Sequence, residues 1–363
     1  MKILILSNHY LTLRVFRREL IQEMSKDNEV VISLPEDEKE YMDELRSFGA
    51  RLVFLKNMDR RAINPIEDLK LIREYKKLLK DERPDKVITY TIKCNVYGAY
   101  ACKKLNIPCY CNITGLGSAF YNGGLVKFIT SKLYKYTMNK SKVVFFENKG
   151  NEKTLIDMKI FKPEQTYVLN GAGVNLDRFP FTEYPRDNGK ISFLFFARIM
   201  KEKGVDELFY SIEKLASEYD NLEFSFIGIY EDEYEDRVNE LEKKGMIKYY
   251  GFQKNVVPYI QQCSCVVLPS YHEGMANTLL ESASIGRPII TSNIHGCMEA
   301  VIDGKSGFLA KVQDKEDLYS KIKQFVELPY EEKASMGKTA RKHMEDSFDK
   351  NKVVAETMKI VIG

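Results

Sequence analysis

Residues 268–293 read LPSYHEGMANTLLESASIGRPIITSN, and the order of patterns in this stretch decides the fold class. An apolar run, Cys265–Leu268, ends in a polar loop, and a helical pattern follows over residues 276–285. Gly286 then ends the helix, and a second apolar run begins three residues later. A strand, a loop, a helix and another strand within one tight unit predict a parallel sheet with helices packed between its strands.

The same alternation runs through the whole chain. The strand-like runs are 2–7, 30–34, 51–55, 86–91, 109–114, 142–147, 166–169, 191–197, 223–227, 248–250, 265–268, 289–292 and 308–310, and helical patterns include 15–24, 66–79 and 125–138. Residues 171–189 interrupt the alternation with several Gly and Pro. We therefore predict an α/β chain of two Rossmann-like parallel-sheet domains that face each other across a cleft: an N-terminal domain 1–170, a linker 171–189, a C-terminal domain 190–347, and a helical tail over 330–362. Ligands of such sheets bind at the carboxyl ends of the strands.

Composition limits the class of protein. The chain has 363 residues, a net charge of +3 and seven cysteines in no framework spacing. These predict buried free thiols of a reducing cytoplasm, with metal or redox roles as the alternative. Residues 2–7 resemble a short signal segment but are better read as a first strand. The sequence has no apolar run of about 18 residues, so we expect no membrane span.

The charge is distributed unevenly. Residues 101–150 contain eight Lys, one Glu and no Arg or Asp, a net +7. A basic first half indicates an anionic partner or an anionic membrane surface, with a merely solvated basic face as the alternative. We expect no nucleic-acid partner.

Two carboxylates stand out in the opening stretch. Glu273 lies in the loop and Glu281 on the helix, with seven residues between them. At the helical rise they are roughly 10 Å apart, which is too far to share a proton but suits the two ends of an extended ligand. The first amides of the helix, from Asn277, Thr278 and Leu279, predict an anion site. The alternative is a pair of exposed helix-end carboxylates.

A second motif follows the run 191–197, where the sequence reads RIMKEKG. Arg198 and Lys203 place two cations at one strand-to-helix turn. Such cations clamp phosphate oxygens and stabilise the negative charge of a departing diphosphate. The alternative is an exposed basic turn flanked by Glu202 and Asp206.

Together the two motifs resemble the R-x4-K-G and E-x7-E signatures of retaining glycosyltransferases of family 4, which have the GT-B fold. The chain is most similar to bacterial members that assemble capsule, O-antigen and other surface polysaccharides or lipid-linked oligosaccharides. The resemblance implies a hexosyltransferase that moves a sugar from a nucleoside diphosphate sugar, expected to be a UDP-sugar, to a hydroxyl of a polyprenyl-diphosphate-linked or saccharide acceptor. The departing phosphate would help to take the acceptor proton.

The resemblance also assigns roles to residues. Arg198, Lys203 and Glu273 are the expected catalytic residues, with Glu273 facing the donor sugar. The expected donor-binding residues are Glu281 at the ribose hydroxyls, the backbone of Met275, Ala276, Asn277, Thr278 and Leu279, and Gly251 and Phe252 in a turn beside the base. No cofactor is expected, and metal independence is implied because basic groups and a helix end replace a metal. The acidic runs 36–40 and 231–235 are accordingly interpreted as solvated loops.

The chain departs from the family pattern at two places. Met275-Ala276 stands where members usually have Phe-Pro or Phe-Gly, which affects sugar selectivity. Thr114 precedes Gly115 where many members have a His near the reacting sugar. His9 and Arg14, in and after the first loop, are the other acceptor-side candidates.

The first domain carries the expected acceptor surface. Five arginines and three lysines form a candidate surface for a lipid diphosphate and an anionic membrane: Arg14, Arg17, Arg18, Arg60, Arg61, Lys127, Lys132 and Lys135. Residues 125–138 have an amphipathic pattern, and we expect their apolar face in the core rather than on a membrane. The family resemblance further implies that the last helix, about 348–363, crosses back to the first domain. It also implies a cytoplasmic protein at the inner face of the plasma membrane.

Two other functions stay open from the sequence. One is a UDP-sugar 2-epimerase of the same fold, which needs proton-transfer residues, and the chain has only four histidines. The other is a non-catalytic subunit that binds nucleotide sugars. Incubation with a donor panel and a lipid-linked acceptor separates transfer, free epimer and binding without turnover.

Overall fold

The computed structural model describes residues 1–56, 65–117, 120 and 124–363. It divides into two compact units, one of Met1–Gly173 with Lys350–Gly363 and the other of Val174–Asp349. Arg60 and Arg61, two of the predicted acceptor-surface arginines, lie outside the described residues.

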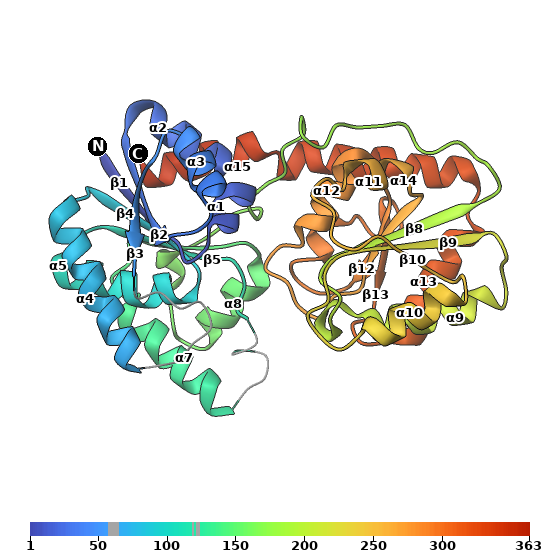
Figure 1. Cartoon of the computed structure of the whole chain (residues 1–363), viewed down its shortest axis with the longest axis horizontal. Coiled ribbons are helices and arrows are strands. Elements are labelled where there is room, and N and C mark those ends of the chain that lie inside the picture. Colours follow the sequence, from blue (N-terminus) through green and yellow to red (C-terminus); the bar gives the residue numbers. More distant parts are fainter. Residues whose placement is uncertain (57–64, 118–119, 121–123) are drawn as a thin grey trace. The chain divides into compact units, whose positions relative to one another are not determined.

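The first unit is built on a seven-stranded parallel sheet of order β3-β2-β1-β4-β5-β6-β7 (Figure 1). Its strands are β1 Lys2–Leu6, β2 Glu29–Pro35, β3 Arg51–Leu55, β4 Lys86–Tyr90, β5 Cys109–Ile113, β6 Val143–Phe146 and β7 Thr166–Val168. Its helices are α1 Tyr10–Phe16, α2 Arg18–Asp27, α3 Lys39–Ser47, α4 Pro65–Glu82, η1 Cys94–Gly98, α5 Ala99–Leu105, α7 Gly124–Thr137, α8 Lys149–Asp157, η2 Pro163–Gln165 and α15 Lys350–Val361.

The central strand β1 shows why its sequence is a continuous apolar run. Ile3 pairs with Val30 of β2 on one side and with Lys86 of β4 on the other. Leu4 and Leu6 face one hydrophobic core, and Ile3 and Ile5 face a second core on the opposite side of the sheet. Because helices cover both faces, the residues of this strand after Lys2 are all buried, with no alternation towards water.

Helix α15, at the end of the chain, belongs to this first unit. It packs against α2, and Val353 and Val361 join the core on the Ile3 face. The Lys86 ammonium donates hydrogen bonds to the carbonyls of Val361 and Ile362 at 2.6 and 3.1 Å. The last carbonyls of the helix are therefore bound by a cation of the central sheet, which favours the negative end of the helix dipole.

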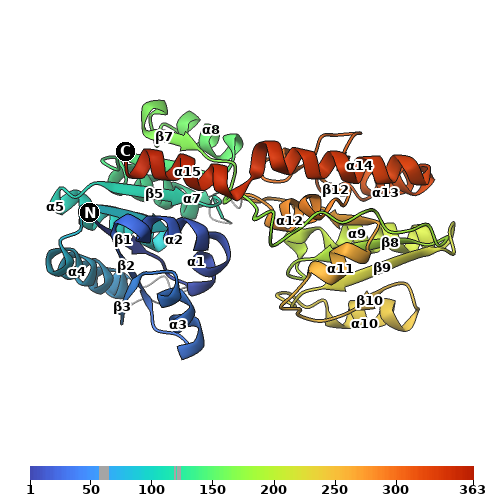
Figure 2. The same cartoon turned by 90° about the horizontal axis from the view of Figure 1, so that it is seen from above.

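The second unit has a six-stranded parallel sheet of order β10-β9-β8-β11-β12-β13. Its strands are β8 Ile191–Phe196, β9 Leu222–Ile227, β10 Lys248–Tyr249, β11 Cys265–Leu268, β12 Ile289–Ser292 and β13 Gly307–Ala310. Its helices are η3 Lys201–Lys203, α9 Val205–Ala216, α10 Glu235–Lys243, α11 Val257–Gln262, α12 Asn277–Ile285, η4 Met298–Ala300, α13 Lys315–Glu327, α14 Tyr330–His343 and η5 Met344–Phe348. Helix α14 packs beside α12 (Figure 2), with Gly337 against the Gly286 carbonyl.

These two parallel sheets confirm the predicted fold class. Every predicted strand is present, and each end lies within one residue of its predicted place. One helix prediction is wrong, because residues 15–24 belong to two helices, α1 and α2. The break lies at Arg17, whose φ of −126° and ψ of 8° are not helical. All seven cysteines are buried and free, as predicted.

Arg287 fixes the segment that leads into the second unit. Its side chain is fully buried, and its guanidinium donates to the carbonyls of Thr182, Glu183, Ile260 and other residues of the unit. Burial lowers its pKa, yet carbonyl acceptors surround the cation. Arg287 forms no direct ion pair among the described residues, so these hydrogen bonds compensate most of the cost of burying its charge.

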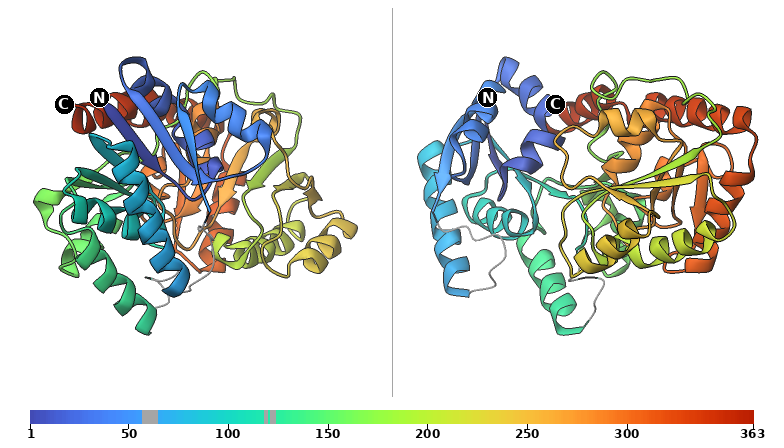
Figure 3. Two further views of the ribbon diagram at one scale, coloured as in Figure 1. Left: turned by 60° about the vertical axis from the view of Figure 1, so that its left-hand side comes forward. Right: turned by 45° about the vertical axis from the view of Figure 1, so that its right-hand side comes forward.

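The prediction that the apolar face of 125–138 lies in the core is wrong. In α7, Leu125, Phe128 and Tyr136 are 72%, 60% and 57% exposed, whereas Tyr134 is buried. The helix projects from the rest of its unit in Figures 1 and 3. An amphipathic pattern fixes two faces but not which of them packs inward. Among the described residues, no helix is both long and apolar enough to cross a membrane.

Candidate functional site

The predicted cationic turn leaves the carboxyl end of β8 and is held against the end of β11. Gly204, at φ 71°, closes the turn, and a Cβ there would lie 2.1 Å from the Pro269 carbonyl oxygen. The Tyr271 amide also donates to the Glu202 carbonyl at 2.9 Å. Only glycine fits this close approach, so the K-G part of the motif has a steric cause.

Lys203 meets Glu273 across these two neighbouring strands. Its ammonium binds Oε1 of Glu273, and the side chains of the pair are only 15% and 14% exposed. The Ser270 hydroxyl donates to the same oxygen at 2.9 Å. Strands β9 and β11 flank β8 on its two sides, so the pair lies where the strand order reverses. That edge is where open α/β sheets bind ligands.

Arg198 also has a carboxylate partner. Its guanidinium lies 3.2 Å from Glu231, and the Lys201 amide donates to Asp232 at 2.9 Å. The acidic run 231–235 is exposed, as predicted for a solvated loop, but its first two residues bind the cationic turn. Arg198 is half exposed, so this ion pair is weak and exchanges readily with another anion.

The start of α12 offers fewer free amides than the sequence predicts. The Ala276 amide donates to the Gly296 carbonyl at 2.8 Å, and the Leu279 amide donates to the Ala276 carbonyl at 2.9 Å. The prediction of an unpaired Leu279 amide is therefore wrong, because the first turn tightens. Asn277 and Thr278 remain as amide donors at this helix end, which no side chain of the described residues caps.

The other predicted donor residues lie on the same unit. Met275 is buried, whereas Glu281 is half-buried on α12. The Gly251 carbonyl, just after β10, accepts from the Gly228 amide at 3.0 Å, and Phe252 beside it is 66% exposed. An exposed ring at the carboxyl edge of the sheet is suited to stack on a planar base.

His272 adjoins the Lys203–Glu273 pair. Burial lowers its pKa below the usual value, and the Glu202 and Glu273 carboxylates only partly oppose that effect. The imidazole is therefore neutral at pH 7.

In the first unit, the predicted acceptor-side residues lie at the carboxyl edge of the sheet or just beyond it. His9 caps α1, where its Nδ1 accepts from the Leu11 amide at 3.2 Å. Arg14, within α1, forms an ion pair with Glu44. Thr114 and Gly115 follow β5 and are half-buried.

Among the described arginines of the first loops, Arg17 and Arg18 do not take part in an open anion-binding cluster. Arg17 is 5% exposed and binds Glu147, which follows β6, at 2.7 Å. Arg18 lies over the ring of Phe48, 4.9 Å from its centroid. The sequence prediction of a shared phosphate surface is therefore wrong for Arg17, whose charge is already paired in the interior.

Thr91 is a candidate that the sequence does not reveal. It follows β4, next to β1 at the point where the first sheet reverses its order. Its φ is 75°, and its buried hydroxyl has no hydrogen-bond partner among the described residues. A β-branched residue in this conformation is strained, and such strain is common at functional sites. No motif marks it, because strain arises only in the folded backbone.

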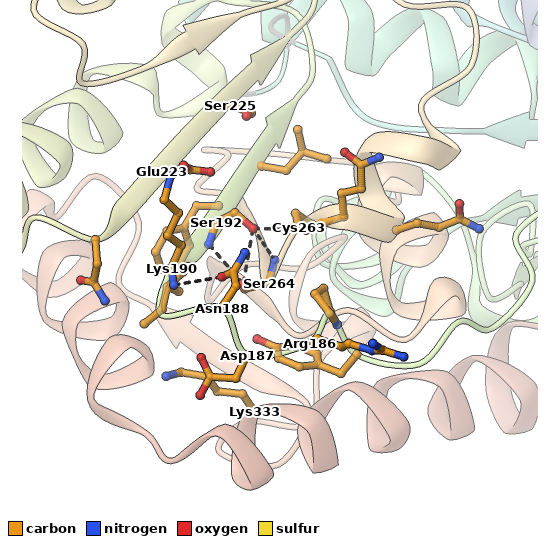
Figure 4. A pocket seen from close by; sticks show the side chains of 18 of the residues that line it. Arg186, Asp187, Asn188, Lys190, Ser192, Glu223, Ser225, Cys263, Ser264 and Lys333 are labelled. Carbon is orange, nitrogen blue, oxygen red and sulfur yellow. Dashed lines mark hydrogen bonds and ion pairs between the residues drawn. The ribbon is translucent and has the colours of Figure 1, made fainter.

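A cavity of 860 Å³ lies at the opposite, amino-terminal edge of the second sheet (Figure 4). Several of its polar groups bind one another: Ser192 and Ser264 exchange hydrogen bonds at 3.1 Å, and Lys190 binds Glu223. The Lys333 ammonium donates to the carbonyls of Val326 and Leu328. These groups are occupied within the protein, so the cavity is a weaker ligand site than the carboxyl edge.

The described residues contain no group of three or more His, Cys, Asp or Glu side chains placed to hold a metal ion.

Comparisons with known proteins match the two halves of the chain to two family models. Residues 2–148 match the family described as Glycosyl transferase 4-like, and residues 179–343 match Glycosyl transferases group 1.

Two relatives are similar over about nine tenths of the chain. The chain is 29% identical, over 90% of both proteins, to the N,N'-diacetylbacillosaminyl-diphospho-undecaprenol alpha-1,3-N-acetylgalactosaminyltransferase of Campylobacter jejuni. It is 22% identical to the capsular polysaccharide biosynthesis glycosyltransferase CapM of Staphylococcus aureus, over 91% of this chain and 88% of the relative. Anabaena Alr3699/HepE, solved with UDP and glucose, has a similar fold with a TM-score of 0.79 at 17% identity, over 99% and 98% of the two chains.

Proposed function

Since the chain belongs to the glycosyltransferases, with a glycosyl transferase 4-like part followed by a group 1 part, we propose that it moves a sugar from a UDP-sugar to a hydroxyl of a polyprenyl-diphosphate-linked saccharide. The anomeric configuration would be retained. The product would extend a lipid-linked chain in the biosynthesis of a bacterial surface polysaccharide.

One observation carries the choice of acceptor. The Campylobacter relative, whose name describes an acceptor sugar on diphospho-undecaprenol, matches the chain over 90% of each length. A match of this extent includes the first unit, where the acceptor is expected to bind. The CapM relative supports the same kind of assembly.

The ion pairs of the second unit support a role for Arg198 and Lys203 in binding the diphosphate. Both cations have carboxylate partners, Glu231 and Glu273, that occupy the place of an anionic ligand. In the proposed reaction the donor phosphates replace these partners. The released Glu273 then faces the donor sugar, with Ser270 fixing one of its oxygens.

The proposed reaction is a single transfer on one face of the sugar. The bond from the anomeric carbon to the diphosphate oxygen breaks as a bond to the acceptor oxygen forms, and the acceptor proton passes to the departing phosphate. Arg198, Lys203 and the amides of Asn277 and Thr278 would stabilise the charge that develops on that phosphate. We propose that these groups suffice without a metal ion.

The proposed setting is the cytoplasmic face of the plasma membrane. A polyprenyl chain stays in the bilayer, so the enzyme must approach the surface to reach its acceptor. The net charge of +7 over residues 101–150 supports attraction to anionic lipids.

The test is a donor panel of UDP-sugars, incubated with a polyprenyl-diphosphate-linked saccharide and with a free saccharide. We expect one donor to give an extended lipid-linked product with retained configuration, and we expect EDTA to leave the rate unchanged. Free epimer without transfer would replace this proposal by an epimerase. Saturable UDP-sugar binding without any product would replace it by a binding subunit.

A further inference from the structure

We propose that the exposed face of α7, together with the lysine-lined depression beside it, docks the first unit on a bilayer that contains anionic phospholipids. The proposal goes beyond the sugar transfer itself. It rests on the proposed function only in explaining why the enzyme needs the membrane.

The apolar side of α7 is exposed. Large hydrophobic side chains are exposed along its length: Leu125, Val126, Phe128, Ile129, Leu133 and Tyr136. At 100° per residue, most of these fall on one side, whereas the buried Tyr134 falls on the other. Single exposed hydrophobic residues are ordinary, but a contiguous face of this kind marks an interaction surface.

Three lysines without carboxylate partners among the described residues lie along the flank of α7 that faces the depression, and Lys132 and Lys135 border the apolar side. Lys127, Lys132 and Lys135 form no ion pair with any described residue, although paired lysines are common elsewhere in the chain. Lys132 lies over the ring of Phe128, 5.3 Å from its centroid. Apolar residues beside unpaired cations are the composition of helices that lie in the headgroup region of anionic membranes.

A depression of 390 Å³ gathers all three lysines beside the helix. Its lining includes Ser131 from α7 and Met158 and Ile160 from the segment after α8. Three ammonium groups fit a lipid phosphate, and the two apolar residues fit the start of an acyl chain; the Ser131 hydroxyl already donates to the Lys127 carbonyl. The depression therefore provides a specific contact in addition to the general surface charge.

The charges favour a bilayer over a second copy of the chain. In a twofold dimer through this face, the lysines around one α7 would meet the lysines around the other. Like charges opposed in this way oppose association. A bilayer with anionic headgroups instead complements the lysines and accepts the apolar side chains.

The experiment measures co-sedimentation of the full chain with vesicles of phosphatidylcholine alone or with 30% phosphatidylglycerol, at roughly physiological salt. We expect binding to the anionic vesicles only. Each lysine near such a surface contributes about fivefold, so the variant K127Q/K132Q/K135Q should partition roughly 100-fold less. The matched control is K243Q/K305Q/K311Q, which removes three exposed lysines of the second unit and should bind like the wild type.

A second variant, L125Q/F128Q/I129Q, tests the apolar contact and should lose binding even to anionic vesicles. Its control is I302Q/V312Q, on the second unit. Circular dichroism checks that each variant is folded. The proposal is overturned if the wild type does not bind anionic vesicles, if both lysine variants bind equally, or if the α7 variants abolish self-association in sedimentation velocity instead.

Transfer to a detergent-solubilised acceptor separates this proposal from the proposed function. The α7 variants should keep wild-type rates there, because the bilayer is absent. A chain that binds vesicles but transfers no sugar would refute the proposed function and leave the docking face intact. A chain that transfers sugar without binding vesicles would refute the docking face and leave the proposed function intact.

Discussion

Replacing Lys203 with Met separates the structural role of this lysine from its catalytic role. The substitution keeps an aliphatic side chain of similar length but leaves Glu273 largely buried with only the Ser270 hydroxyl as a described partner. A fully buried pair that loses one partner is destabilised by about 3–5 kcal/mol. Because both side chains keep some exposure, we expect a loss of about 2 kcal/mol in the free energy of unfolding.

The catalytic effect should be larger than the effect on folding. A stability of about 5–15 kcal/mol keeps the variant folded, so its activity reports on the site. Loss of one group that stabilises a developing oxyanion costs about 10²–10³-fold in rate, and we expect kcat/KM to fall by that factor. Isothermal titration with UDP should also show weaker binding.

Two further variants sharpen this prediction. K201M removes an exposed lysine two residues away and should retain wild-type kcat/KM and stability. In K203M/E273Q no buried carboxylate is left without a cation, so urea unfolding should recover most of the lost stability while activity stays low. If K203M keeps kcat/KM within threefold of the wild type, Lys203 does not hold the departing phosphate.

Three other perturbations follow from the geometry. G204A forces a Cβ against the Pro269 carbonyl, and urea unfolding should show a loss of about 2–4 kcal/mol, whereas an unchanged midpoint would contradict the close approach. R287M leaves several carbonyls without a donor and should lower the free energy of unfolding by about 3 kcal/mol or more, with R287K recovering part of it. His272 has a lowered folded-state pKa, so stability should fall as pH drops below 6.5 towards that pKa, and H272Q should remove this part of the pH profile. If H272Q and the wild type have the same dependence of stability on pH, burial does not lower the pKa of His272.

The fold was predictable because its physical cause is local in the sequence. Strands that helices cover on both faces must be continuous apolar runs, and the run in β1 sends Leu4 to one core and Ile5 to the other. The break at Arg17 was not predictable, because no Gly or Pro marks it, and the partner of this buried arginine, Glu147, is 130 residues away.

The site was only partly predictable for the same reason. The sequence supplies Lys203 and Glu273 as separate motifs, but their contact spans 70 residues and exists only in the folded sheet. Thr91 carries no sequence signal, since its strain is a property of the backbone. The prediction for α7 was wrong because an amphipathic pattern does not say whether the apolar side packs against protein or is exposed.

The most direct measurement is a crystal structure of the chain with UDP. The account predicts the β-phosphate within hydrogen-bonding distance of the Arg198 guanidinium and the Lys203 ammonium, with Glu273 released from that lysine. UDP bound instead in the cavity at the amino-terminal edge of the second sheet, with the Lys203–Glu273 pair intact, would contradict it.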